Sequence, residues 1–246
     1  MIDACAWTGH WGSMALPGAP GDVVDSVADV GSSRVLLSPL DGVFAHNAHA
    51  ANGAVYDAAH TDGRVLAAPV IDPTVATWEE ELQRAVDVAA LVVRWLPAYS
   101  GFGLSAADDW ARIIRAAGRI LWVQTRLEDA RRQHPQALVP DTDAAEVVEL
   151  ARRHPDMTVA LGGATWKAVL DLAPAILSLP RCFADTSQMD GMDSLLRLVD
   201  AGLAPRLLYG SHAPFFMPLA AVARVILDLD AETANLILHD NASTLL

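Results

Sequence analysis

Short apolar runs alternate with longer amphipathic segments eight times along this chain, and this alternation constrains the fold more than any other feature of the sequence. The apolar runs are rich in Val, Leu and Ile, and most of them lack polar residues at alternate positions. That pattern is typical of parallel strands that are covered by helices. We predict strands at residues 2–7, 34–39, 65–71, 90–96, 119–125, 157–162, 182–187 and 206–211.

Helical patterns fill the gaps between these runs, at residues 22–31, 77–89, 105–118, 141–154, 165–179, 192–202 and 219–227. Gly31 suits a helix C-cap, Thr77 and Glu80 have the spacing of a capping box, and Pro174 interrupts its segment. Eight strands that alternate with helices over 246 residues predict an α/β fold, a closed (β/α)₈ barrel. An open doubly wound sheet is the competing fold, but no G-x-G-x-x-G motif follows an early strand.

Composition limits the class of protein and the partners to expect. At 52% hydrophobic and 19% charged residues, without an internal linker, the chain is expected to form one compact domain over residues 1–246. A net charge of −13 argues against a nucleic-acid partner and against an anionic membrane surface. Cys5 and Cys182 are too few for a disulfide framework, and neither a signal peptide nor a membrane-length apolar run is evident, so we expect a cytoplasmic location.

A (β/α)₈ barrel places its chemistry at the C-terminal ends of its strands, so the predicted strands give a set of candidate residues. The candidates with functional side chains at these ends are Cys5, Trp7, His10, Arg94, Gln124, Arg126, Asp185 and His212. Arg94 stands out because an arginine within an apolar strand must be paired or must bind an anion.

Several segments at these ends resemble one known family. They are "IDACAWTG", "VRWLPAYSGFGL", "VALGG", "FADTS", "LLYGSHAPF" and the C-terminal "NASTLL". In this order they are similar to the amidohydrolase-related family, which comprises metal-dependent hydrolases and decarboxylases on a (β/α)₈ barrel. The resemblance covers nearly the whole chain. It implies a small organic substrate and a homodimer as one oligomeric state to test.

The resemblance also implies where a metal would be bound. The family's ligands are an H-x-H pair on the first strand, histidines on the fifth and often the sixth strand, and an aspartate after the eighth. In this chain those positions hold Cys5, Trp7, Gln124, Ala160 and His212. Indole and methyl side chains donate nothing to a divalent cation, and a catalytic site wants at least three protein donors. We therefore predict no metal and no cofactor, with a Cys5–His10–His212 site as the alternative.

The remaining candidates are assigned roles as hypotheses. We predict that Arg94 and Arg126 hold an anionic group, that Trp7 and Gln124 face the ligand inside the barrel, and that His212 and Asp185 are catalytic. We expect His212 to be exposed at the mouth of the barrel. The structural alternatives are a packed His212 that shapes its turn, an Asp185 that caps a turn, and an ion pair of Arg94 with Asp185 or Asp72.

Two functions follow from these assignments. The first is a metal-independent enzyme that acts on, or binds, a small carboxylate or carbonyl compound. The second is a non-catalytic relative of the same barrel that binds a ligand or serves as a structural protein. The sequence leaves the identity of the substrate and the oligomeric state open.

Overall fold

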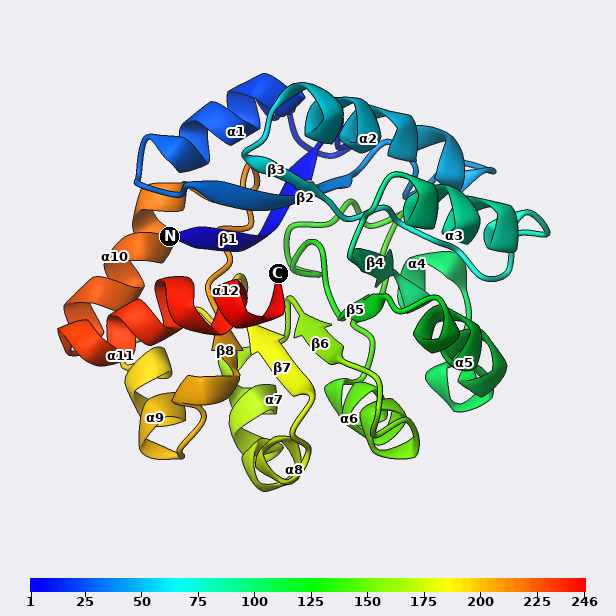
Figure 1. The fold of residues 1–246 in the computed structure, drawn as a ribbon. Coiled ribbons are helices and arrows are strands. Elements are labelled where there is room, and N and C mark those ends of the chain that lie inside the picture. The colour runs from blue at the N-terminus through cyan, green and yellow to red at the C-terminus, as the bar shows by residue number, and fades with distance from the viewer.

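Eight parallel strands form a barrel surrounded by helices (Figure 1) in the computed structural model, which describes all residues from 1 to 246. The strands are β1 (Ile2–Thr8), β2 (Arg34–Pro39), β3 (Val65–Ala67), β4 (Val92–Trp95), β5 (Ile120–Gln124), β6 (Val159–Gly162), β7 (Cys182–Asp185) and β8 (Leu207–Leu208). They form two hydrogen-bonded sheets, β1-β2-β3 and β4-β5-β6-β7-β8. Parallel bridges Ala6–Ala213 and Val70–Arg94 join these sheets and close the barrel, so the predicted (β/α)₈ architecture is confirmed.

Most of the helices form the outer ring, whereas α12 (Asn241–Leu245) at the C-terminus lies across one end of the barrel (Figure 1). The helices are α1 (Pro20–Ala28), α2 (Asn52–Thr61), α3 (Trp78–Asp87), α4 (Pro97–Ser100), α5 (Asp108–Ala116), α6 (Ala144–Arg153), α7 (Trp166–Asp171), α8 (Ala173–Ser178), α9 (Ser194–Asp200), α10 (Pro218–Asp228), α11 (Ala231–Asn235) and α12. Short 3₁₀ segments lie at Ala48–Ala51, Leu104–Ala106 and Ala204–Arg206, and Leu236–Asp240 is a π-helical turn. No helix of the protein is both long enough and apolar enough to cross a membrane.

Some predicted boundaries are wrong, and the reasons are local. The third strand ends at Ala67 because Pro69 has no N–H, although its carbonyl still accepts the Arg94 N–H at 2.8 Å. The predicted helix at 165–179 divides into α7 and α8, with Pro174 in the first turn of α8. The Thr77 side chain makes no capping hydrogen bond, so the capping box predicted there does not form.

Side chains inside the barrel form two apolar layers. The lower layer consists of Ile2, Ala4, Leu36, Ala68, Val92, Ile120, Trp122, Ala160, Leu208 and Ala242 of α12, and Leu66 of β3 and Phe183 of β7 pack against it. The upper layer consists of Cys5, Trp7, Trp11, Leu40, Val43, Val70, Leu96, Leu127 and Phe215. A larger cluster between the strands and the helices completes the core. The centre of the barrel is therefore packed and does not form a pore.

An irregularity in β1 determines which of its residues enter the barrel. Ile2 and Ala4 belong to the lower interior layer, whereas Cys5 and Trp7 belong to the upper one. Side chains of a regular strand alternate between faces, so Ala4 and Cys5 cannot both point inward without an interruption. The pairing of β1 with β2 shifts its register between Asp3 and Ala6, which supplies this interruption. The shift turns Cys5 and Trp7 toward the centre.

Candidate functional site

Arg94 lies at the centre of the barrel and is completely buried. Its Nη1 donates to Oε1 of Gln124 and lies 3.7 Å from Sγ of Cys5. The guanidinium carbon lies 4.6 Å from the centre of the Trp7 ring and 5.5 Å from that of Trp122. Both distances are within the range of cation–π attraction. The guanidinium is therefore surrounded by an amide, a thiol and two indoles.

No carboxylate pairs with Arg94, so the predicted ion pair with Asp185 or Asp72 is wrong. The nearest link to an acid is indirect: the ring of Trp122 faces the guanidinium and its Nε1 donates to Oδ2 of Asp185 at 3.0 Å. Asp72 instead accepts from the backbone and side chain of Thr74. The other prediction for Arg94, that it holds the anionic group of a ligand, stays a prediction.

Trp7 and Gln124 face the barrel interior, as predicted. Both are buried, and both contact Arg94. Gln124 is held in place by a second hydrogen bond, in which its Nε2 donates to the carbonyl of Arg126 at 2.7 Å. Nε1 of Trp7 and the Nε and Nη2 of Arg94 have no hydrogen-bond partner among the protein's own atoms. The unpaired groups at this centre are thus N–H donors.

These residues do not fit a divalent metal. A catalytic metal site needs about three donors, and the centre offers N–H groups, two indole rings, one amide oxygen that already accepts from Arg94, and one thiol, Cys5, whose pKa burial raises to about 12. No three His, Cys, Asp or Glu side chains cluster where they could hold a metal ion. The alternative Cys5–His10–His212 site is wrong as well, since the His10 side chain is 95% exposed and pairs with Asp41 at 3.0 Å.

His212 is a core residue, so the prediction that it is exposed at the mouth is wrong. Its relative exposure is 0%, and its ring stacks on Phe215 at 4.9 Å and lies against Phe216 at 5.2 Å. Its Nε2 donates to the carbonyl of Leu127 at 2.7 Å, which leaves Nδ1 free to accept from the thiol of Cys5 at 3.9 Å. Burial lowers the pKa of His212 to about 3, so the imidazole is neutral near pH 7.

Both carboxylate oxygens of Asp185, the predicted partner of His212, accept hydrogen bonds from other groups. Its Oδ1 accepts from the backbone N–H groups of Gly163 and Ser187, both at 3.1 Å, and from the Ser187 hydroxyl at 2.6 Å. Its Oδ2 accepts from Trp122. These contacts join the ends of β5, β6 and β7 and match the turn-capping alternative. Asp185 makes no hydrogen bond with His212.

Two further residues change the expected picture. Asp3 on β1, which the sequence did not single out, is fully buried, and its Oδ1 accepts the N–H groups of Cys5 and Ser211. Burial raises its pKa to about 6.

Arg126 is mostly buried and lies 3.7 Å from Asp129 and 3.8 Å from Asp141, so its predicted contact with a ligand stays a prediction.

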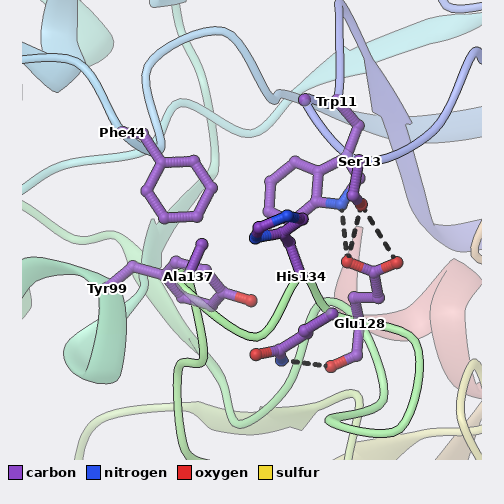
Figure 2. Close-up of a pocket in the computed structure, with 9 residues that line it drawn as sticks. Trp11, Ser13, Phe44, Tyr99, Glu128, His134 and Ala137 are labelled. Carbon is purple, nitrogen blue, oxygen red and sulfur yellow. Dashed lines mark hydrogen bonds between the residues drawn. The ribbon is translucent and has the colours of Figure 1, made fainter.

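One accessible cavity at the ends of the strands, of about 320 Å³, is lined by aromatic side chains, and we call it the mouth pocket. Loops that follow β1, β2 and β5 contribute to its wall, and so does α4 after β4, which places it at the C-terminal face of the barrel. Its side chains include Trp11, Ser13, Phe44, Tyr99, Glu128 and His134 (Figure 2). Neither Arg94, Gln124, His212 nor Asp185 lines it.

Glu128 and three aromatic rings define the character of the mouth pocket. Nε1 of Trp11 donates to Glu128 Oε2 at 2.8 Å, and the Ser13 hydroxyl donates to the same oxygen at 3.0 Å (Figure 2). The ring centres of Trp11, Phe44 and Tyr99 lie 5.4–6.1 Å apart. Arg94 is completely buried and lies outside the wall of this pocket.

Sequence reasoning missed most of this pocket. None of the candidate residues at the predicted strand ends lines it. The strand-end rule could have found Glu128, which follows the last residue of β5 by four positions.

Comparison with solved structures supports the same architecture. A 2,6-dihydroxybenzoate decarboxylase from Rhizobium superposes with a TM-score of 0.69 at 17% identity, over 90% of this chain and 86% of the other. A 5-carboxyvanillate decarboxylase from Novosphingobium aromaticivorans, with bound manganese, gives 0.68 at 14%, over 89% and 78%. A TIM-barrel protein of unknown function from Bordetella bronchiseptica gives 0.68 at 14%, over 99% and 97%.

Identities this low establish the fold, a TIM barrel, and leave the chemistry of the chain open. The chain matches no protein-family model, and no curated protein is similar enough in sequence to count as a relative.

Proposed function

We propose that this protein is a divergent member of the amidohydrolase-related family that binds a small organic molecule in its mouth pocket and performs no metal-dependent chemistry. The observation that carries the proposal is the position of Arg94. Its guanidinium contacts Cys5, Trp7 and Gln124, the residues that stand where the resemblance implies metal ligands. A permanent positive charge of the protein thus occupies the region in which such a family holds its cation.

The mouth pocket is the proposed ligand site for two reasons. Barrel proteins bind their substrates at the C-terminal face, in pockets built from the loops that follow the strands. A volume of about 320 Å³ and a wall of aromatic side chains with a few polar groups suit a small organic ligand. The structural neighbour from Novosphingobium carries a substituted nitrobenzoic acid, which is a ligand of this size.

Metal-independent catalysis by His212 with Asp185 is the less favoured function. A general base must reach the proton that it removes, and His212 has no exposed surface. Its lowered pKa, about 3, also makes it a weak base. Asp185 makes no hydrogen bond with His212, and both of its carboxylate oxygens accept hydrogen bonds from other groups.

A thermal-shift experiment on the full chain tests the proposal. A panel of small aromatic acids, alcohols and amines is applied to the wild type, Phe44→Ala and Leu227→Ala. Phe44 and Leu227 are both largely exposed, at 62% and 79%, so neither change should disturb the core. A ligand at about 100 times its Kd stabilises the fold by about 2.7 kcal/mol, enough for a clear rise in Tm.

We expect at least one panel compound to raise the Tm of the wild type and of Leu227→Ala, and to raise that of Phe44→Ala much less. A ligand response that Phe44→Ala retains and Arg94→Met abolishes would place the ligand at the barrel centre instead. Turnover of any panel compound that depends on added Mn²⁺ or Zn²⁺ would contradict the proposal as a whole.

A further inference from the structure

Glu128 is a buried acid without a basic partner. It is 5% exposed, and no Lys, Arg or His nitrogen lies within 4.0 Å of its carboxylate. The arginines of the same loop are engaged elsewhere: Arg126 and Arg131 with Asp129, and Arg132 with the sulfur of Met14. The neutral donors Trp11 and Ser13 hold the carboxylate in place and leave its charge uncompensated. A buried charge of this kind calls for an opposite charge nearby.

The aromatic wall of the mouth pocket suits the same kind of partner. The rings of Trp11 and Phe44 are 5.4 Å apart, and Tyr99 lies 5.6 Å from Phe44 and 6.1 Å from Trp11. Figure 2 shows these rings and the Glu128 carboxylate on the sides of the His134 ring, which also lines the pocket. The negative faces of aromatic rings attract cations, most strongly where water is excluded.

We propose that the mouth pocket binds an organic ammonium ion, with its charged group against Glu128 and its substituents against Trp11, Phe44 and Tyr99. The inference rests on the proposed function, because it names the ligand class of the same pocket. The net charge of −13 favours the approach of a cation and disfavours that of a carboxylate. It replaces the carboxylate ligand that the arginines had suggested, because neither Arg94 nor Arg126 lines the pocket.

Three probes of nearly equal shape and different charge test the inference: benzylammonium, benzyl alcohol and benzoate. Binding of each to the full chain is measured by calorimetry at pH 7.5 and low ionic strength. The variants are Glu128→Gln and Phe44→Ala, and Glu149→Gln on α6 is the control for the loss of one negative charge. Glu149 is exposed, so its replacement leaves the pocket intact.

We expect benzylammonium to bind the wild type and Glu149→Gln at least tenfold more tightly than benzyl alcohol, and benzoate to bind least. Glu128→Gln should lose about tenfold in affinity for benzylammonium and leave benzyl alcohol unchanged. Phe44→Ala should weaken both. Because Phe44 is exposed, this second variant still reports on the pocket if Glu128→Gln folds poorly.

Three outcomes overturn the inference, and only the last of them also overturns the proposed function. If benzoate or benzyl alcohol binds at least as tightly as benzylammonium, and Phe44→Ala weakens that binding, the pocket is a ligand site with another preference and the proposed function stands. The same holds if Glu128→Gln binds benzylammonium like the wild type. If none of the three probes binds, and no compound of the thermal-shift panel does, the inference and the proposed function fail together.

Discussion

Arg94 and Trp7 face each other inside the barrel, with the guanidinium carbon 4.6 Å from the centre of the indole ring. Trp7 reaches this position because the irregularity in β1 turns it inward. Both side chains are completely buried, and the guanidinium has no acid beside it. Cation–π attraction from Trp7 and Trp122 and the hydrogen bond to Gln124 therefore provide the compensation for its lost hydration.

This arrangement predicts that the bulk of Arg94 matters more to stability than its charge. Arg94→Met keeps most of the volume and removes a buried charge that no acid pairs with, so the free energy of unfolding should change by less than about 2 kcal/mol. Arg94→Ala also leaves a cavity among Trp7, Trp122 and Gln124, and should cost roughly 2–4 kcal/mol more than Arg94→Met. Urea denaturation of both variants measures the difference. Equal losses would mean that the charge, and not the packing, is what the site needs.

The second prediction concerns Asp3 and the pH dependence of stability. The folded state raises its pKa from 3.8 to about 6, so the native protein binds this proton more tightly than the unfolded chain does. The resulting stabilisation is complete below about pH 4 and is lost as the pH rises through about 6. A shift of this size corresponds to about 3 kcal/mol.

Asp3→Asn removes this titration and keeps an oxygen that can accept the N–H groups of Cys5 and Ser211. Relative to the wild type, the variant should gain about 3 kcal/mol between pH 4 and pH 8. Denaturation at several pH values gives the difference. A constant difference between the two proteins across this range would show that Asp3 does not titrate there.

The third prediction concerns His212, whose folded pKa is lowered from 6.5 to about 3 by burial. The unfolded chain binds this proton more readily than the folded protein does. The contribution of neutral His212 to the free energy of unfolding is therefore complete above about pH 6.5 and decreases as the pH falls toward 3. The C–H resonances of the His212 ring should not shift between pH 5 and 8. His212→Asn assigns the signal and suits the positive φ of 59° at this position. A midpoint near 6.5 for His212 would contradict its burial.

The fourth prediction concerns the two cysteines. Cys5 and Cys182 are free and buried, and burial raises the pKa of each thiol to about 12. Because the thiolate is the reactive form, neither should react with a disulfide reagent in the native protein at pH 8, and both should react in denaturant. Cys182→Ala allows Cys5 to be followed alone. Rapid modification of native Cys5 would show that solvent reaches the barrel centre.

Much of the barrel could be predicted because its signals are local. Buried parallel strands form continuous apolar runs, and the run at 34–39 coincides with β2. The irregularity in β1 could not be predicted, since Ala4 and Cys5 are both small and apolar and give no alternation to read. The two-residue length of β8 also escaped prediction, because the Tyr209 N–H donates to the carbonyl of Ile237, outside the sheet, although the Tyr209 carbonyl still accepts the N–H of Ala4.

The site was predicted only in part because its covering residues are distant in sequence. The strand-end rule placed Trp7, Arg94 and Gln124 near one another, and they are in contact. It could not reveal that Leu127 and Phe215 cover His212, since those contacts depend on how two loops fold over the barrel. Glu128 meets Trp11 and Ser13 across more than 110 positions of sequence, and no local pattern reports such a contact.

The central proposal is that the guanidinium of Arg94 occupies the region in which the family that this chain resembles binds its metal ion. The most direct measurement is the metal content of protein purified without an affinity tag from medium supplemented with manganese and zinc, determined by elemental analysis. The Arg94–Trp7–Gln124 contacts predict far less than one equivalent of any divalent metal per chain. A content close to one equivalent that is lost in Cys5→Ser or His212→Asn would contradict the claim.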